Sequence, residues 1–96
     1  MTKDIKIEDI VRVLKRVIDP EMHIDIYSLG LVYDIKQSSA GALVTMTLTT
    51  PLCPYADEIV ADVKKAVESL GMHVEVKVTF TPPWVPPANL RAIFGV

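Results

Sequence analysis

The spacing of apolar residues changes several times along this chain, and it constrains the fold more than any other feature. Between Lys6 and Ile18 apolar positions recur every three or four residues with charged residues between them, which is the pattern of an amphipathic helix. Acidic residues come early in this segment and basic residues late, as the helix macrodipole favours. Because a residue before proline is disfavoured in the α region, Asp19-Pro20 predicts that this helix ends near Ile18.

Two strands are expected next. Residues 29–35 are mostly apolar and begin a strand, and in residues 44–49 three apolar residues alternate with three threonines, which predicts a second strand. The stretch Ser38-Ser39-Ala40-Gly41 between them has the composition of a turn. We therefore expect the two strands to form an antiparallel hairpin.

A second helix and a third strand complete the pattern. Pro54 suits the first turn of a helix, and apolar residues then trace one face from about Tyr55 to Leu70. From residue 74 to 80 apolar and polar residues alternate, which predicts a strand with one buried face. The order αββαβ predicts an α+β fold, a two-layer sandwich in which the helices cover one face of a mixed three-stranded sheet. We expect a proline-rich tail, residues 81–96, to pack on this sandwich and to end in a short helix.

Size and composition limit the class of protein. Ninety-six residues, half of them hydrophobic, suit a single domain over residues 1–96. Ten Lys and Arg against twelve Asp and Glu, with no basic run, argue against nucleic-acid binding. The apolar runs are far shorter than the roughly 20 residues of a membrane span. One cysteine cannot form an internal disulfide and the first residues lack the apolar stretch of a secretion signal, so we expect a cytoplasmic protein.

Cys53 is the leading candidate for a functional residue. It lies in Thr49-Thr50-Pro51-Leu52-Cys53-Pro54, where a predicted strand ends and a predicted helix begins. The free N–H groups and the positive dipole end at a helix start favour a thiolate, which is a nucleophile and a metal ligand. The alternative is that a lone cysteine is a small buried apolar residue. One cysteine cannot supply the four ligands of an ordinary iron–sulfur cluster.

Four polar residues could support Cys53. Asp19 and Glu21 flank Pro20 in a rigid corner that could orient a thiol, cap its own turn or coordinate a metal. Thr49 and Thr50 lead into the cysteine loop, where they could bond to a thiolate or to the loop's own amides.

Three further side chains have two readings each. His23 is a candidate ligand or general base, although a surface histidine is the commoner explanation for such a loop position. His73 is a second candidate ligand by residue type, but it follows Gly71 at a strand start, where a solvated turn histidine is the commoner explanation. Trp84, between two pairs of prolines, could bind a partner or cover the core.

Four motifs of this chain resemble those of the metal–sulfur cluster biosynthesis domain family, also called PaaD-like or SufT-like, in the same order and with similar spacing over nearly the whole chain. They are Asp19-Pro20-Glu21, Leu29-Gly30-Leu31-Val32-Tyr33, Met46-Thr47-Leu48-Thr49-Thr50-Pro51-Leu52-Cys53-Pro54 and Pro82-Pro83-Trp84.

The resemblance implies an α+β domain that acts in iron–sulfur cluster assembly or delivery, together with other assembly factors rather than as a self-sufficient enzyme. It implies that Cys53 is the functional thiol, that Asp19 and Glu21 form the family's acidic corner, and that Thr49 and Thr50 lead into the loop. The chain departs from the family pattern around Trp84 and has no cysteine-rich C-terminal extension. It therefore resembles the stand-alone form, for which no structural zinc is expected.

Three functions stay open from the sequence. We expect an assembly factor, an adaptor or transient carrier of iron or a labile iron–sulfur cluster, whose partners are assembly proteins and client apoproteins; in a homodimer a second Cys53 would add a thiolate. The first alternative is a thiol-transfer or hydrolytic enzyme with Cys53 as nucleophile and His23 as base. The second is a pure interaction module that docks a client through an edge strand or Trp84.

Overall fold

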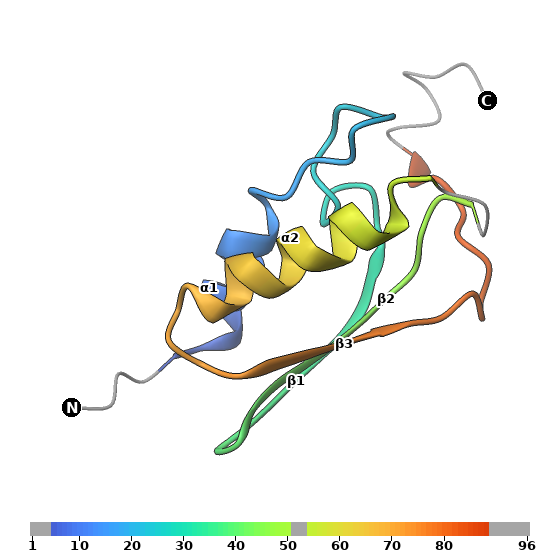
Figure 1. Cartoon of the computed structure of the whole chain (residues 1–96). Coiled ribbons are helices and arrows are strands. Elements are labelled where there is room, and N and C mark those ends of the chain that lie inside the picture. Colours follow the sequence, from blue (N-terminus) through green and yellow to red (C-terminus); the bar gives the residue numbers. More distant parts are fainter. Residues whose placement is uncertain (1–4, 51–53, 89–96) are drawn as a thin grey trace.

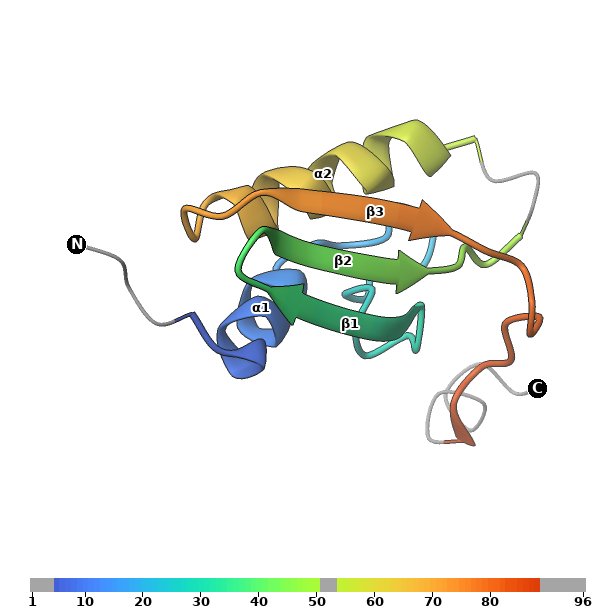
Figure 2. The ribbon, with the colours of Figure 1, turned by 90° about the horizontal axis from the view of Figure 1, so that it is seen from below.

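The computed structural model describes residues 5–50 and 54–88. Its helices and strands follow the chain in the order α1 (Ile7–Leu14), β1 (Val32–Ser38), β2 (Gly41–Met46), α2 (Ala56–Glu68) and β3 (Val74–Val78). Both helices lie on one face of the sheet (Figures 1 and 2). The expected α+β fold, with its order αββαβ and its two layers, is confirmed. The short helix expected within the tail lies largely in residues 89–96, outside the described residues.

The sheet is mixed and has the strand order β1-β2-β3. β1 and β2 form the expected antiparallel hairpin, in which Ser38 lies opposite Gly41, and the register shifts between Val32 and Asp34. β2 and β3 are parallel, with Val44 opposite Val76. Parallel neighbours need a crossover connection, and α2 lies in that connection. The carboxyl ends of β2 and β3 therefore meet at one end of the molecule.

The core lies between the sheet and the helices. α2 buries one face through residues spaced by four, and β2 buries every second side chain. Burial of each large apolar side chain stabilises the fold by roughly 1.5–3 kcal/mol. The main contributors are Ile10, Leu14, Ile26, Leu29, Leu31, Val44, Met46, Ile59, Val63, Val67 and Val74. No helix within residues 5–50 and 54–88 has the length and apolar content needed to cross a membrane.

The start of α1 is held by Asp9. Its carboxylate accepts the backbone N–H of Lys6 at 2.9 Å and also binds the guanidinium of Arg12. The backbone N–H of Lys6, more than the charge of Arg12, holds the pKa of the Asp9 carboxyl below its ordinary value. The acidic side chains of this first turn suit the positive end of the helix dipole.

α1 is shorter than the apolar spacing predicts. It ends at Leu14, and Ile18, expected on the buried face, is 50% exposed. The reason is that the chain after the helix pairs with residues 24–26: Ile26 N–H donates to Val17 C=O at 2.9 Å, and Asp19 N–H donates to Ile24 C=O at 3.0 Å. These bonds between neighbouring loop segments take the place of the helical bonds that periodicity alone would extend to the proline.

The third strand also departs from the expected pattern. Val74 is buried and Val76 is half-buried, but Val78 and Phe80 are 38% and 41% exposed. β2 ends at Met46, earlier than expected, although Leu48 remains buried. Thr47 is fully buried, and its N–H donates to Leu31 C=O at 2.8 Å, which holds this residue against the start of β1.

Gly41 makes the junction between the hairpin and β3 feasible. Its φ is +141°, and a methyl group there would lie 2.2 Å from the carbonyl oxygen of His73. That carbonyl accepts the N–H of Ala42 at 2.9 Å, the first bond of the parallel pairing. A side chain at position 41 would therefore push β3 away from β2.

Gly41→Ala should destabilise the fold much more than Gly71→Ala. Gly71 also has a positive φ, +88°, but no atom lies within 4 Å of an added methyl group. Its substitution should therefore lower the free energy of unfolding by only roughly 1–2 kcal/mol, the cost of placing alanine in a left-handed conformation. Gly41→Ala adds roughly 1–3 kcal/mol of overpacking. Urea unfolding of both variants measures the difference. Equal losses of stability would show that β2 and β3 do not depend on this close approach.

Candidate functional site

The candidate site lies at the carboxyl ends of β2 and β3. Thr49 and Thr50, both half-buried, follow β2, and the exposed Pro54 and Tyr55 lead into α2. Cys53 itself lies outside the described residues. Ligand sites of parallel sheets are typically found at this end, where strands end and the following helix starts. The described neighbours of Cys53 therefore lie where the sequence predicts a functional loop.

Asp19 is the most deeply buried polar residue of the corner. The residue is only 1% exposed. Its side-chain Oδ1 accepts the backbone N–H groups of Glu21 at 2.8 Å and Met22 at 3.1 Å. Its own carbonyl accepts the N–H of His23 at 2.8 Å. Asp19 therefore fixes the turn that Pro20 begins, through both its side chain and its backbone.

The second oxygen of the same carboxylate has no such partner. Asp19 Oδ2 is buried, and no hydrogen-bond donor within the described part of the chain reaches it. An ionised carboxylate can accept several hydrogen bonds, and buried polar atoms in folded proteins nearly always have at least one partner. The sequence offers two roles for Asp19, capping its turn or binding a metal, and contains no sign that its two carboxylate oxygens differ.

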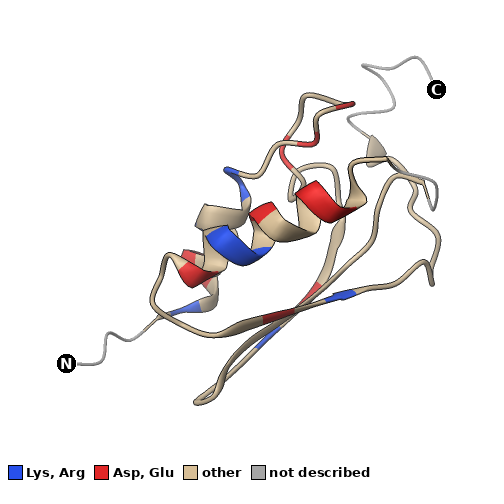
Figure 3. Ribbon diagram, in the orientation of Figure 1, with Lys and Arg blue, Asp and Glu red and all other residues tan. Residues whose placement is uncertain are grey.

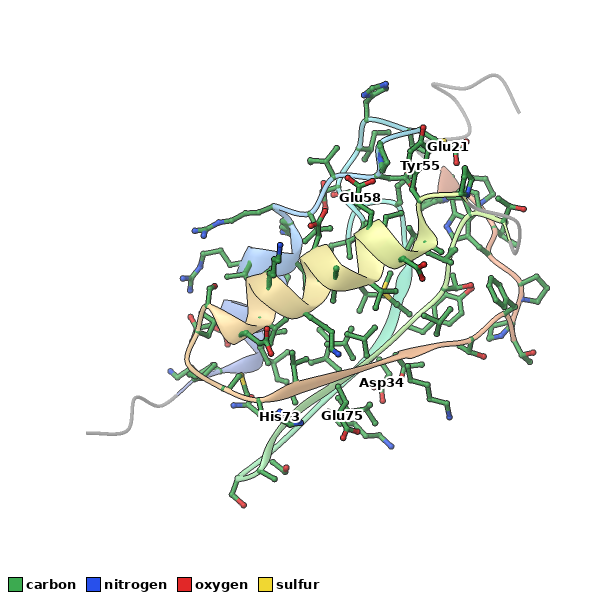
Figure 4. The ribbon with its side chains drawn as sticks, in the orientation of Figure 1. Glu21, Asp34, Tyr55, Glu58, His73 and Glu75 are labelled. Atoms are coloured by element: carbon green, nitrogen blue, oxygen red, sulfur yellow. The ribbon has the colours of Figure 1, made fainter. Side chains whose placement is uncertain are left out.

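Glu21 and His23 lie on the outer side of this corner. The side chains of both residues are exposed, and His23 has a φ of 58°, a left-handed conformation set by the tight turn. In Figure 4 the side chain of Glu21 appears at the same end of the molecule as Tyr55 and Glu58, which belong to the start of α2. Carboxylates of the corner and of the first turn of α2 therefore face the solvent at one end.

Trp84 anchors the tail to the body of the protein. Its indole Nε1–H donates to the carbonyl of Leu29 at 2.7 Å, and its ring packs against the core. Tyr33 forms a second hydrogen bond to the tail: its hydroxyl donates to the carbonyl of Pro82 at 2.8 Å. The exposed apolar side chain nearby is Val85, which is 57% exposed. Trp84 thus covers the core, and a role for it in binding a partner stays a prediction.

The described residues hold no preformed metal site. No group of three or more His, Cys, Asp and Glu side chains in residues 5–50 and 54–88 is arranged to hold a metal ion. A surface hollow of about 450 Å³ lies at the opposite, hairpin end, lined by residues 36–38, 40–43, His73 and Glu75. His73 is exposed there, as expected for a solvated turn residue, with its Nε2 4.0 Å from Glu75 Oε1.

The fold and the site define a small α+β domain whose single cysteine follows the central strand and precedes a helix. Residues 7–80 match a family described as iron–sulfur cluster assembly protein, and the chain belongs to this family. The resemblance noted from the four motifs is thereby confirmed.

Relatives from several bacteria agree with this assignment. The chain is 49% identical over 80 residues to an Fe-S protein maturation auxiliary factor of Porphyromonas gingivalis, covering 80% of this chain and 76% of that one. It is 45% identical over 80 residues to the Fe-S protein maturation auxiliary factor YitW of Bacillus subtilis, covering 80% and 78%. Among solved structures, a conserved hypothetical protein from Thermotoga maritima matches with a TM-score of 0.88 and 44% identity over the whole of both chains.

Removal of the indole N–H should loosen the tail. Trp84→Phe leaves the carbonyl of the buried Leu29 without its donor, which should cost about 1–3 kcal/mol of unfolding free energy. The control is Tyr33→Phe, which removes the more exposed bond to Pro82 and should cost about 0.5–1.5 kcal/mol. Denaturation followed by circular dichroism compares the two. A Trp84→Phe protein as stable as the wild type would contradict the anchoring role.

Proposed function

We propose that this chain is an accessory factor of iron–sulfur cluster assembly, which takes up and passes on iron or a cluster through the thiolate of Cys53. The observation that carries the proposal is the family match over residues 7–80, because this range contains Cys53 together with the strand before it and the helix after it. The names of the Porphyromonas and Bacillus relatives point to the same process.

A single thiolate suits a protein that hands its cargo on. An ordinary cluster needs four protein ligands, so at least part of the coordination must come from a client apoprotein, an assembly protein, a small thiol or a second copy of this chain. Bound cargo is then easily exchanged, since no complete set of ligands competes with the receiving protein. Asp19, Glu21, Thr49 and Thr50 are the supporting residues of this proposal.

The enzyme alternative is less well supported. A nucleophilic cysteine needs a base that is oriented within hydrogen-bond reach of the sulfur. His23 is the candidate base from the sequence, and it is an exposed residue whose backbone is committed to the turn of Asp19. These features fit a solvated loop histidine better than an oriented base.

Anaerobic reconstitution with iron and sulfide tests the proposal. Wild-type protein should retain iron after desalting, seen by visible absorbance and metal analysis, and should transfer it to an apoprotein. Cys53→Ser should retain and transfer little, because serine replaces the soft thiolate with a hydroxyl that binds iron poorly.

His23→Gln is the control variant and should behave like the wild type. A Cys53→Ser protein that retains and transfers iron as well as the wild type would contradict a carrier role for the thiolate. A thiol-transfer or hydrolytic activity that both Cys53→Ser and His23→Gln abolish would instead favour the enzyme alternative.

A further inference from the structure

The outer side of β3 is an unpaired strand edge. β3 lies at one side of the sheet (Figure 2), and among residues 5–50 and 54–88 no strand pairs with its other side. The carbonyl of His73, just before β3, and the N–H of Thr79, just after it, bond to β2. Because the backbone groups of successive residues in a strand point to alternate sides, the N–H and C=O groups of Val74, Val76 and Val78 point to the open edge. Such an edge is a template for pairing with another strand.

The opposite edge of the sheet, along β1, is protected. The register of β1 with β2 shifts near the start of β1, and irregularities of this kind discourage pairing at an edge. Other segments also contact both ends of β1: the Tyr33 hydroxyl donates to the carbonyl of Pro82 at 2.8 Å, and Gln37 Nε2 donates to the carbonyl of Ile5. The pairing of β3 with β2 has no register shift. Of the two edges, that of β3 is therefore the better suited to bind another strand.

The charges of β3 fit one particular partner. β3 carries one acidic and one basic residue along its length (Figure 3), Glu75 and Lys77; both are exposed, and their neighbours on β2 are the uncharged Leu43 and Thr45. Glu75 points away from the helices in Figure 4. If two β3 strands pair antiparallel about a two-fold axis at Val76, Glu75 of each copy lies opposite Lys77 of the other. Opposite charges that face each other across two strands stabilise the pairing, and like charges destabilise it.

The charges also select this register against its neighbours. A shift of the two-fold axis by one residue in either direction sets Glu75 opposite Glu75 or Lys77 opposite Lys77, which is unfavourable. The axis at Val76 is also compatible with the backbone, because it sets Val76 opposite Val76 and Val74 opposite Val78, and these are the residues whose N–H and C=O groups point outward.

The same register covers apolar side chains that are exposed in the single chain. Val78, which is 38% exposed, comes opposite Val74 of the second copy, and Phe80, which is 41% exposed, comes opposite Met72 of the second copy. Val74 and Met72 pack in or against the core. The pairing therefore brings the exposed apolar side chains of one copy to the edge of the other copy's core.

We propose that the partner at the β3 edge is a second copy of this chain, which pairs antiparallel through its own β3. The three strands of each copy then form one continuous sheet, with the helices of both copies on the same face. Both copies use the same surface, as in most homodimers. The inference goes beyond the proposed function and does not depend on it, since the pairing involves no metal.

Sedimentation equilibrium of the full chain, over about 1 μM to 1 mM, tests the inference. The wild type should form a dimer whose population rises with concentration. Lys77→Glu places two glutamates opposite each other at two positions of the symmetric pairing, so the dissociation constant should rise by about tenfold or more. Glu75→Lys should have the same effect. The double variant Glu75→Lys/Lys77→Glu is the matched control: it restores both contacts between opposite charges and should dimerise like the wild type. Circular dichroism checks that each variant is folded.

Three results would overturn the inference. If the wild type stays monomeric over the whole range, the open edge is left to a strand of another protein. If the dimer forms but neither single variant weakens it, the two copies meet through a different surface. If the single variants weaken the dimer and the double variant does not restore it, Glu75 and Lys77 do not face each other and the register is wrong.

Amide hydrogen exchange, followed by NMR on the wild type, locates the interface without any substitution. The amides of Val76 and Val78 point to the open edge, so their exchange should slow as the protein concentration rises. The amide of Ile35 is the reference, because this residue lies opposite Val44, whose backbone groups face β3, and therefore points to the β1 edge. Unchanged exchange at Val76 and Val78 in a dimeric sample, or equal slowing at Ile35, would contradict pairing through β3.

Discussion

The parallel pairing of β2 with β3 is the constraint on which the rest of the structure depends. It requires a crossover, which places α2 over the sheet, and it brings the carboxyl ends of both strands to the end where α2 begins. The pairing begins at the bond between Ala42 and His73, where only glycine fits at position 41. A glycine at one end of the sheet thus helps to determine the geometry of the candidate site at the other.

Much of this fold could be predicted because its elements have regular apolar spacing. The α2 helix was predicted within two residues at either end, since its pattern agrees with local turn and capping preferences. The end of α1 was not predicted correctly, because Val17 and Asp19 form backbone hydrogen bonds with residues 24–26. The spacing of apolar residues carries no information about such pairing. The exposure of Val78 and Phe80 was missed for a related reason: alternation predicts which side chains share a face, but not how far the helices cover that face.

In the candidate site, too, the sequence predicts the residue types but not the contacts that they make in the folded chain. The residue types and spacing of Asp19-Pro20-Glu21 suggest a turn and a carboxylate, and the structure adds that one oxygen is bound and the other is not. Trp84 is equally ambiguous in sequence, and its bond to Leu29 shows what the indole does in the folded chain. The family assignment gives the process in which the chain acts, which neither Asp19 nor Trp84 would show by itself.

The most direct test of this account is X-ray absorption at the iron edge of wild-type protein loaded with one equivalent of Fe²⁺. The account predicts a first shell that contains a sulfur neighbour, from the thiolate of Cys53. A first shell made only of oxygen and nitrogen would contradict the account, because iron would then be bound without the thiolate.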